Sequence, residues 1–326
     1  MYNVAILGYR AQGSQHHAPA FARLPDCRIV AVCDVVEERA REGAERYGVP
    51  AYVEADEMLD REEIDIVDVP VGERFRYELV MKALRRGKHV FTEKPLVAGD
   101  GQFKIQPADV PVARELIDEW QKHDAQFGIC FGLHASPNVQ RVKAVLAGGE
   151  LGEVRHIQAR THPGPWNHIL DLVRFLGGEV DEVTAIADNA DLSNKAACLR
   201  FENGAVGTLS FCGEVSLQFQ LKWVGTRGEA TLDNIAGTAT WHRHDSLDVT
   251  HWQETSHVKP ATYHRLFEDL IADFVASIRE GRPFVADGWA GLRHVEIDAA
   301  ITESIRTRRP VKVERYRPDR GRRPLL

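Results

Sequence analysis

Long hydrophobic runs are missing from this sequence. No uninterrupted apolar stretch among its 326 residues approaches the roughly 20 residues that a membrane-spanning helix needs. The first apolar run, Val4–Leu7, is too short to be the core of a signal peptide, and no charged region precedes it. The sequence therefore predicts a cytoplasmic protein that does not associate with a membrane.

An excess of positive charge and paired cysteines are also missing. The 41 lysines and arginines are outnumbered by 48 aspartates and glutamates, and a net charge of −7 supplies no positive field to attract nucleic acid. No two cysteines form a Cys-x-x-Cys pair, and we expect reduced core thiols at Cys27, Cys33, Cys130, Cys198 and Cys212. Nucleic-acid binding and dithiol redox chemistry are therefore disfavoured.

The signatures of two other site types are absent. The chain contains no Gly-x-Ser-x-Gly elbow, which argues against a serine hydrolase of that kind. His242 and His244 would point to one face of a strand, as a metal pair needs, but no third ligand is evident from the sequence. The chain also lacks internal repeats and low-complexity segments. We therefore expect no metal site.

What is present is a globular composition, with 44% hydrophobic and 27% charged residues and a length that suggests two domains. In the first 130 residues, short β-branched runs alternate with stretches of helical periodicity. The predicted strands are Val4–Leu7, Ile29–Cys33, Ile64–Val69, His89–Phe91 and Phe127–Phe131. The predicted helices are Ser14–Arg23, Glu37–Tyr47, Tyr77–Arg86 and Val112–His123. This alternation predicts an α/β domain with a doubly wound parallel sheet.

After about residue 132 the pattern changes to extended segments separated by turns. A helix over Val139–Leu146 precedes them, and two helices over Tyr263–Glu280 and Trp289–Arg308 follow. The predicted strands are Val154–Arg160, Val183–Ala187, Ala196–Phe201, Val206–Phe211, Leu217–Val224 and Glu229–Leu232. We predict a first domain over 1–132 and a second, α+β domain over 133–326 with a large, mostly antiparallel open sheet. Gly99–Pro107 is expected to be an exposed loop, and Arg315–Arg323 a solvated tail.

The turn after the first strand carries a dinucleotide-binding pattern. It reads Gly8-Tyr9-Arg10-Ala11-Gln12-Gly13, with arginine at the second glycine position of the fingerprint. Arg10 either crowds the pyrophosphate path, which would leave a nucleotide-free domain, or swings out to clamp a phosphate. Asp34 ends the second strand, where a carboxylate accepts hydrogen bonds from the ribose 2′-hydroxyl and repels a 2′-phosphate. Since Val35, Val36 and Glu37 bring no cation, NAD is favoured over NADP in a Rossmann-type domain.

The segment Gly87-Lys88-His89-Val90-Phe91-Thr92-Glu93-Lys94-Pro95-Leu96 resembles the glucose–fructose oxidoreductase / inositol dehydrogenase (Gfo/Idh/MocA) family, whose fifth strand leads into a Glu-Lys-Pro turn with a catalytic lysine. Further similar segments are 149–154, 201–207, 225–228 and 278–283, so that the resemblance covers about residues 3–313. It implies a cofactor site comprising Gly8, Tyr9, Arg10, Gln12, Gly13, Asp34, Val69, Pro70, Glu93 and Lys94.

Lys94 and His168 are the predicted catalytic pair. A lysine at the carboxyl edge of a parallel sheet faces the ligand crevice, where its ammonium can stabilise alkoxide charge during hydride transfer. Glu93 is expected to hold that ammonium. The resemblance implies that His168, at the start of a helix, is the general acid/base, a task that suits imidazole. Asp171 lies three residues further on the same helical face and is predicted as a third catalytic residue.

Two segments depart from the family pattern. The family usually has an aspartate four residues before the histidine, where this chain has Gly164 in a shortened segment. Asp171, His162 or Asn167 would have to substitute for it, and Trp166 is expected to form an apolar wall for a sugar ring. The family's Thr-Pro and histidine after the fourth strand are also replaced. There Arg74 or Arg76 either contacts an anionic ligand or is a solvated helix-start residue.

These observations predict an NAD-dependent oxidoreductase that removes a hydride from a secondary hydroxyl of a sugar, cyclitol or related polyol. Two alternatives stay open at this point. One is an NAD-retaining lyase, epimerase or glycosidase that oxidises its substrate transiently. The other is a non-catalytic binding protein of the same fold. Because related proteins bury the open sheet of the second domain, the resemblance also implies a homodimer or homotetramer.

Overall fold

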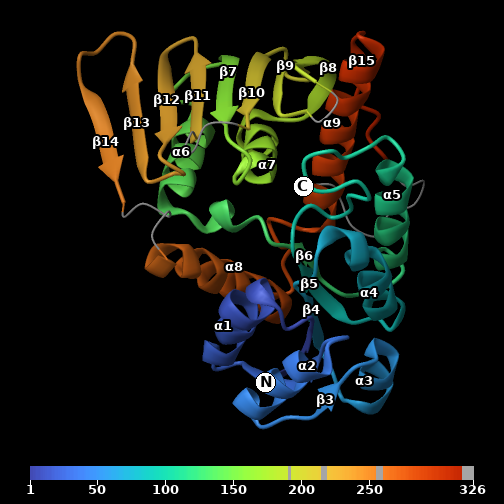
Figure 1. The fold of residues 1–326 in the computed structure, drawn as a ribbon. Helices are drawn as coiled ribbons and strands as arrows, with labels where there is room; N and C mark the ends of the chain where they lie inside the picture. Colours follow the sequence, from blue (N-terminus) through green and yellow to red (C-terminus); the bar gives the residue numbers. More distant parts are fainter. Residues whose placement is uncertain (190–191, 214–218, 255–259, 318–326) are drawn as a thin grey trace.

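The computed structural model describes residues 1–189, 192–213, 219–254 and 260–317. The first two residues of the predicted strand Leu217–Val224 and most of the predicted tail Arg315–Arg323 lie outside the described residues. In the ribbon, the parallel sheet and its helices form the lower part of the molecule and a broad second sheet forms the upper part (Figure 1). The structure therefore has the two kinds of sheet that the sequence predicts.

The first sheet is parallel throughout and has the strand order β3-β2-β1-β4-β5-β6. Its strands are β1 (Tyr2–Leu7), β2 (Cys27–Cys33), β3 (Ala51–Tyr52), β4 (Ile66–Val69), β5 (His89–Thr92) and β6 (Phe127–Ile129). This is the order of a doubly wound dinucleotide-binding sheet, in which the chain reverses direction between β1 and β4. Ligands of such sheets bind at the carboxyl ends of the strands beside that point, so the predicted fold class is confirmed and the expected site position follows.

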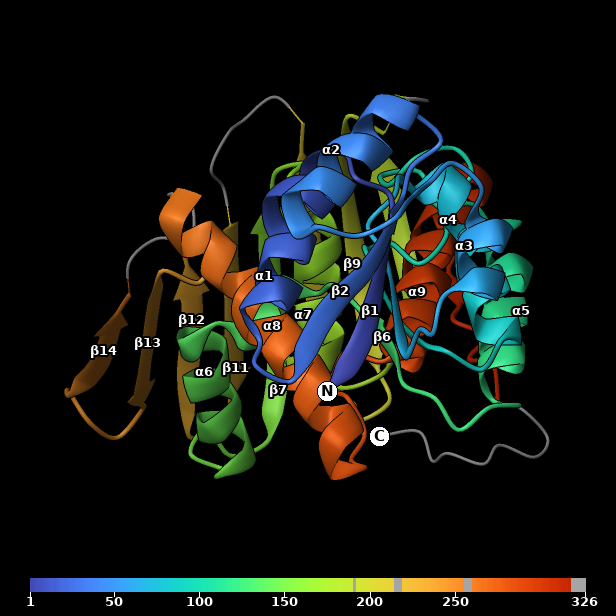
Figure 2. The same ribbon diagram turned by 90° about the horizontal axis from the view of Figure 1, so that it is seen from below.

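Helices cover both faces of this sheet, with α1 and α8 on one side and α3, α4 and α5 on the other (Figure 2). The helices of this half are α1 (Ala18–Arg23), α2 (Glu37–Tyr47), α3 (Ala55–Arg61), α4 (Glu73–Arg85) and α5 (Asp109–Trp120). The predicted single helix Ser14–Arg23 instead begins with a π-helical turn, η1 (Gly13–His17). The sequence did not predict α3 or β3, because elements of seven and two residues are too short to show a clear periodicity.

The second sheet has nine strands in the order β14-β13-β12-β11-β7-β10-β9-β8-β15. They are β7 (Val154–Thr161), β8 (Val180–Ala187), β9 (Asn194–Phe201), β10 (Val206–Cys212), β11 (Phe219–Gly225), β12 (Gly228–Asp233), β13 (Thr238–Arg243), β14 (Val249–Gln253) and β15 (Val311–Lys312). All neighbouring pairs are antiparallel except β7 and β10. The mostly antiparallel sheet is confirmed, although the sequence did not predict the bounds of β13, β14 and β15.

Helices pack against one face of the second sheet and leave the other face open (Figure 1). They are α6 (Pro137–Ala147), α7 (Trp166–Gly177) and α9 (Gly288–Thr307), with a 3-10 turn, η2 (Gly132–Ala135), before them. Strand β9 shows the consequence, since its residues alternate strictly between buried and less buried positions. On the open face, Ile186 and Val206 are largely exposed.

Helix α8 (Pro260–Glu280) joins the two halves. Its Phe274 packs on Phe91 of β5 and on Phe284, and Phe267 lies beside His17. Both α8 and α9 contribute to the hydrophobic core that contains the parallel sheet. The last helices of the expected second domain thus pack against the first, and the boundary at residue 132 stays a prediction.

The segment 99–107 is only in part the exposed loop that its glycine and proline content suggested, with Gly99, Asp100 and Pro107 exposed. Ile105 is fully buried, and the ring of Phe103 lies 5.9 Å from that of Phe211 in the second sheet. Gln102 accepts a hydrogen bond from Asn167 at 3.3 Å. The expectation was wrong for the middle of the segment because it packs against the second sheet and α7, contacts that local composition does not encode.

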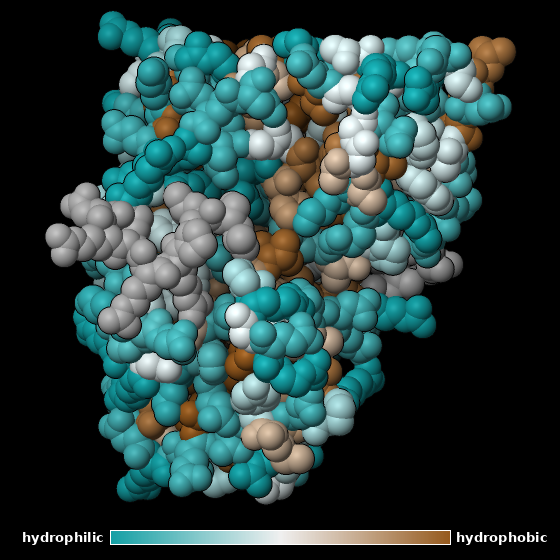
Figure 3. Space-filling view, turned by 180° about the vertical axis from the view of Figure 1, so that it is seen from behind, coloured by the Kyte–Doolittle hydropathy of each residue, from teal (hydrophilic) through white to brown (hydrophobic). Residues whose placement is uncertain are grey.

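The side of the molecule opposite to the view of Figure 1 is mostly hydrophilic, with hydrophobic residues visible near the centre and in smaller spots elsewhere (Figure 3). Within the described part of the chain, none of the helices combines the length and the apolar character that crossing a membrane requires.

Candidate active site

The turn after β1 can be made only by glycines at its two ends. Gly8 has φ +114°, and a Cβ there would lie 2.5 Å from Val71. A Cβ on Gly13 would lie 2.1 Å from the carbonyl oxygen of Gly8, so the start of η1 packs directly against the end of β1. The side chain of Arg10 is exposed and leaves the interior of the turn clear. The turn therefore keeps the close backbone approach that a pyrophosphate needs, despite the arginine.

Asp34 is held in place at the end of β2. Its buried carboxylate accepts hydrogen bonds from the backbone amides of Tyr9 at 2.8 Å and Val36 at 2.9 Å. The ring of Tyr9 is buried beside Tyr47, so Tyr9 contributes its amide to this site. Pro70, after β4, lies next to Gly13. These residues fit an adenosine ribose on Asp34, as an NAD site requires.

Arg39 was missed by the sequence analysis, which considered only the three residues after Asp34. Its guanidinium lies 3.7 Å from the Asp34 carboxylate, one turn into α2, and is partly exposed. Its place in the first turn of the predicted helix Glu37–Tyr47, five residues after Asp34, could have identified it.

We expect Asp34→Ser to weaken NAD binding by about 10–100-fold, since a hydrogen bond to a charged group contributes about 1.5–3 kcal/mol. The same change should strengthen NADP binding, because Arg39 would then face a 2′-phosphate without a competing carboxylate. Calorimetric titration of both cofactors measures this. The double variant Asp34→Ser/Arg39→Ala is the control and should lose the gain in NADP affinity. An unchanged NADP affinity in the single variant would contradict the role of Arg39.

A cavity of about 470 Å³ lies beside this turn, between the parallel sheet, α7 and α8. Lys94, which directly follows β5 with Glu93, lines it together with His162 and His168. The full lining is Gln12, Gln15, His16, Glu93, Lys94, Cys130, Gly132, Leu133, His162, Gly164, Pro165, His168, Ile235, Tyr263, His264, Leu266 and Phe267. Lys94 and His168, 74 positions apart in the sequence, are thus brought to one cavity as predicted, and their catalytic roles stay a prediction.

Glu93 holds Lys94 through the backbone. Its Oε2 accepts the amide hydrogen of Lys94 at 3.1 Å, and its Oε1 lies 3.3 Å from Nε2 of the buried His17. His17 contacts Asp68 at 2.8 Å through its other nitrogen. Burial alone would raise the pKa of Glu93, but the His17 hydrogen bond and the Lys94 charge lower it to about 2. Glu93 is therefore a fixed carboxylate beside Lys94. It contacts the backbone amide of Lys94, whereas the sequence predicted a contact with the side-chain ammonium.

His17, Glu93 and Cys130 also place possible metal-ligand atoms within 4.8 Å of one another. Burial opposes a charge on His17, but the adjacent Asp68 carboxylate raises its pKa well above the usual value. Burial raises the pKa of the Cys130 thiol to about 12. Both groups would have to lose a proton to bind a cation, so this donor set does not fit a metal ion as it stands.

His168 is the third residue of α7, half-buried on the cavity wall. Burial and the nearby positive charge of Lys94 lower its pKa to about 3. Its Nδ1 has no hydrogen-bond partner among the described residues. The ring is therefore neutral at physiological pH, the protonation state in which a general base begins its reaction.

Of the three residues considered as substitutes for a carboxylate at position 164, the structure brings His162 to the cavity. A Cβ on Gly164 would lie 3.3 Å from Nε2 of His162, so this imidazole borders the space that a side chain at 164 would enter. Asn167 is buried and donates to Gln102.

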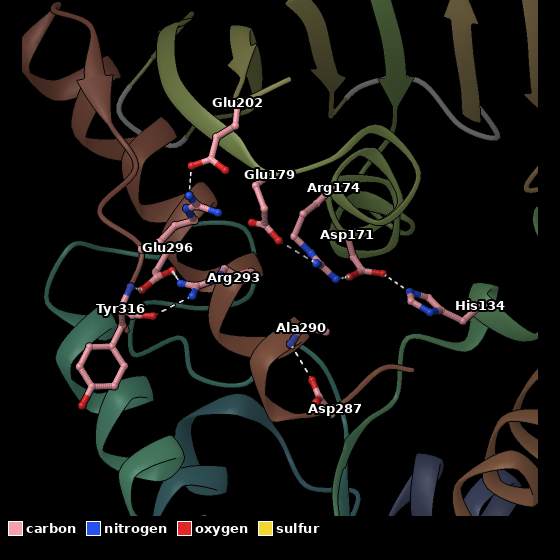
Figure 4. A network of polar contacts seen from close by, with 11 residues as sticks. His134, Asp171, Arg174, Glu179, Glu202, Asp287, Ala290, Arg293, Glu296 and Tyr316 are labelled. Atoms are coloured by element: carbon pink, nitrogen blue, oxygen red, sulfur yellow. Dashed lines mark hydrogen bonds and ion pairs between the residues drawn. The ribbon is translucent and has the colours of Figure 1, made fainter. Parts of the chain in front are cut away.

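Asp171 points elsewhere, as the close view of this polar network shows (Figure 4). It is buried, hydrogen bonds to His134, and lies 3.5 Å from Arg174, which continues to Glu179. The same helical face therefore carries Asp171 into the packing between α7 and η2 and away from the cavity lining. A direct catalytic role for Asp171 is not supported by this geometry.

Two further site expectations are corrected. Trp166 is buried, and its Nε1 donates to Asp298 at 3.0 Å. It packs in the core next to α9 and is not among the residues that line the cavity. Arg76 is buried and donates to the carbonyls of Pro95 and Val71, which fixes the turn that carries Lys94 and leaves no free guanidinium for an anionic ligand. Arg74 is exposed at the start of α4. Both corrections concern tertiary contacts, which reach 132 positions along the chain for Trp166 and 5 and 19 positions for Arg76.

Several cavity residues carried no signal strong enough to single them out. His16 lies in the π-helical turn, with its Nδ1 2.8 Å from Nδ1 of His264 on α8 and its ring stacked on Phe267. Burial and the neighbouring His264 lower the pKa of His16 to about 4. The sequence shows the adjacent pair His16-His17 soon after the glycine turn. Only the structure shows that His16 is half-buried and lines the cavity, whereas His17 is fully buried.

His294 of α9 is fully buried, and neither ring nitrogen has a partner among the described residues. Burial lowers its pKa to about 4. The unfolded chain therefore binds a proton at this residue at a higher pH than the folded chain, so stability falls as pH decreases from about 6.5 to about 4. At about 1.4 kcal/mol per pH unit, His294 alone contributes a loss of about 3 kcal/mol over this range.

We expect His294→Phe to reduce the pH dependence of the unfolding free energy between pH 7 and 4.5. Chemical denaturation at several pH values measures it. His251→Gln, at an exposed histidine of β14, is the control and should show the wild-type slope. An equally steep slope in His294→Phe would contradict the assignment.

Two sequence models of known families match this chain. Residues 2–128 match a model described as "Oxidoreductase family, NAD-binding Rossmann fold", and residues 166–313 match its companion described as "Oxidoreductase family, C-terminal alpha/beta domain". Both models are those of the Gfo/Idh/MocA family.

Curated relatives and solved structures are similar to this chain over half to nearly all of its length. Myo-inositol 2-dehydrogenase of Thermotoga maritima is 25% identical over 342 aligned positions, covering 95% of this chain and 98% of that protein. D-glucoside 3-dehydrogenase of Escherichia coli is 31% identical over 159 positions, 48% of this chain and 42% of that protein. A structure of levoglucosan dehydrogenase with NADH and levoglucosan has a TM-score of 0.83 at 18% identity, covering 96% of this chain and all of that one. The last likeness is one of fold.

Proposed function

Because the chain belongs to the Gfo/Idh/MocA family, an oxidoreductase family with an NAD-binding Rossmann fold, we propose that it oxidises a secondary hydroxyl of a sugar, cyclitol or related polyol. One observation carries the proposal. Lys94 of the parallel-sheet half and the neutral His168 of the second half line the same cavity, next to the Gly8–Gly13 turn. Curated relatives that act on inositol and on glucosides support the polyhydroxylated class.

Lys94 and His168 have different tasks in this reaction: Lys94 stabilises negative charge on the substrate oxygen, and His168 accepts the hydroxyl proton. The Lys94 ammonium donates a hydrogen bond to the substrate oxygen and stabilises the negative charge that develops there. His168 accepts the hydroxyl proton, and the C–H electron pair leaves as hydride, so that the C–O bond becomes a carbonyl. NAD, when bound through Asp34 and the glycine turn, supplies the hydride acceptor. The low pKa of His168 keeps it unprotonated before this step.

His168→Gln should lower kcat by about 10²–10⁴-fold, the usual contribution of a general acid/base. His162→Gln tests whether the second cavity imidazole shares the task, and we expect a smaller loss of about tenfold. Steady-state rates of NADH formation across pH 6–9 measure both, with His251→Gln as the matched surface control. A kcat within threefold of wild type in His168→Gln would exclude it as the base.

The first test of the proposed function is NAD binding followed by a polyol screen. Calorimetry and mass analysis of copurified nucleotide give the cofactor state, and absorbance of NADH reports oxidation of each polyol. Net NADH formation with a polyol supports the dehydrogenase. Substrate conversion without net NADH would instead indicate the cofactor-retaining alternative, and absence of binding to NAD would indicate the non-catalytic one.

We also propose that two or four copies assemble through the open face of the nine-stranded sheet, and that the protein acts in the cytoplasm. Exposed apolar residues on that face, such as Ile186 and Val206, support the assembly. Light scattering at micromolar concentration should give a dimer or tetramer mass, and a monomer mass would contradict the proposal.

A further inference from the structure

The hairpin between β12 and β13 has an unusual backbone. Three consecutive residues without a glycine, Asn234, Ile235 and Ala236, have φ values of +54°, +51° and +58°. Residues with side chains seldom adopt this left-handed region, and a β-branched residue such as isoleucine is a genuine outlier there. Such conformations persist only where the surrounding structure enforces them, and they cluster at ligand sites.

Specific contacts enforce this turn. The buried Asn138 of α6 donates from Nδ2 to the carbonyl of Ala236 at 2.9 Å, and its Oδ1 accepts from Arg141 at 2.8 Å. The carbonyl of Gly237 accepts from the amide of Glu254 at 2.8 Å. Ala236 itself is fully buried. The turn is therefore a supported feature, held from α6 and from the end of β14.

The result of this conformation is the position of Ile235. Its side chain lines the catalytic cavity, whereas Asn234 beside it is exposed. Leu133 of η2 and Leu266 of α8 also line the cavity, and all three aliphatic side chains belong to one hydrophobic cluster. We call these three residues the aliphatic wall.

The charged groups of the cavity lining are already used. Glu93 is hydrogen bonded to His17 and to the Lys94 amide, and Lys94 is assigned to the reacting oxygen. The His16 and His168 rings are neutral because of their low pKa values. Lys94 is the only lysine or arginine in the described lining, so the cavity combines hydrogen-bonding groups for hydroxyls with an aliphatic wall and offers no second permanent cation for a sugar acid or a sugar phosphate.

We propose that the aliphatic wall binds an apolar substituent on an uncharged saccharide, so that the preferred substrates are alkyl or aryl glycosides over free sugars, sugar acids and sugar phosphates. This inference rests on the proposed polyol oxidation and specifies its substrate class. Ile235 is the specificity-determining residue. Glycine or asparagine would adopt its left-handed backbone conformation more easily, but neither would place an aliphatic group in the cavity.

The test uses matched sugar pairs with the full-length protein. D-glucose, D-galactose and D-xylose are each compared with their phenyl β-glycosides, and glucuronate and glucose 6-phosphate serve as charged probes. We measure kcat/KM for NADH formation, and Kd by calorimetry on the NADH-loaded protein. The phenyl glycoside of at least one pair should be favoured by 10-fold or more in both quantities, with the charged probes weaker than glucose.

Two variants distinguish an effect of the aliphatic wall on substrate preference from an effect on the stability of the fold. Ile235→Asn should bring the phenyl preference close to 1, while the melting temperature stays unchanged or rises, because asparagine tolerates the left-handed region better. Asn234→Gly is the matched control, since it relaxes the neighbouring strained residue without changing the wall, and it should keep the preference. The Kd for NAD should be unchanged in both variants.

Equal use of free sugars and phenyl glycosides by the wild type would overturn the inference, as would a preference that persists in Ile235→Asn. A weakened Kd for NAD with an unchanged sugar ratio would overturn it too, because the wall would then contact the cofactor. Selective binding of phenyl glycosides without any NADH formation would contradict the proposed oxidation while supporting the wall, which keeps the two failures distinct.

Discussion

Replacing Lys94 with alanine should lower kcat about 10³-fold or more and leave the Kd for NAD within threefold of wild type. Lys94 follows β5 at the edge where ligands of such sheets bind, and it lines the cavity shared with His168. Removing one donor aimed at developing oxyanion charge costs about 10²–10³ in rate, and loss of a full positive charge should exceed this. The measurement is steady-state NADH formation with the best polyol of the screen, combined with calorimetry for NAD.

Lys94→Arg helps to interpret the result. It keeps the charge but not the compact ammonium, so it should recover only part of the rate. Lys122→Ala, at an exposed lysine just after α5, is the matched control and should be indistinguishable from wild type. If Lys94→Ala kept more than a tenth of the wild-type kcat, Lys94 would not be the group that stabilises the alkoxide, and the cavity would need another electrophile.

Asp298→Ala should destabilise the fold by about 3–5 kcal/mol, the range for removing one partner of a buried ion pair. Asp298 is fully buried; its Oδ1 lies 3.5 Å from Nζ of Lys195, and its Oδ2 accepts from Trp166 at 3.0 Å. The Lys195 ammonium also lies 3.9 Å from the centre of the Trp166 ring and donates to the carbonyl of Phe103. Burial lowers the pKa of Lys195, and without Asp298 its charge would have no carboxylate partner there.

Urea denaturation followed by tryptophan fluorescence measures the loss. The double variant Lys195→Met/Asp298→Ala should regain a large part of it, since both charges are then removed. Arg306→Ala is the control, at an exposed position of α9, the helix that carries Asp298. Its unfolding free energy should stay within about 0.5 kcal/mol of the wild-type value. A single Asp298→Ala variant as stable as this control would show that the pair contributes nothing to the fold.

This ion pair also explains why some site predictions were wrong. Trp166 lies two residues before His168, which lines the cavity, and its aromatic ring suggested an apolar wall for a sugar ring. In the structure, the indole of Trp166 is buried and donates a hydrogen bond to Asp298, which lies 132 positions away on α9. The same reasoning applies to Asp171, whose helical spacing from His168 is right but whose partner His134 comes from η2. Sequence spacing places a residue on a helix face, but it does not say which neighbour that face meets.

By itself the sequence determined the parallel sheet, the antiparallel sheet, the glycine turn with Asp34, and the candidates Lys94 and His168. These depend on local rules: side-chain periodicity, the steric need for glycine, and short motifs in a strand–turn–helix context. Only the tertiary structure decided which polar side chains face the cavity and which are buried in pairs, and it alone revealed Arg39 beside Asp34 and Ile235 in the lining. Those outcomes depend on contacts between distant segments, where burial makes each unpaired polar group costly and thereby selects its partner.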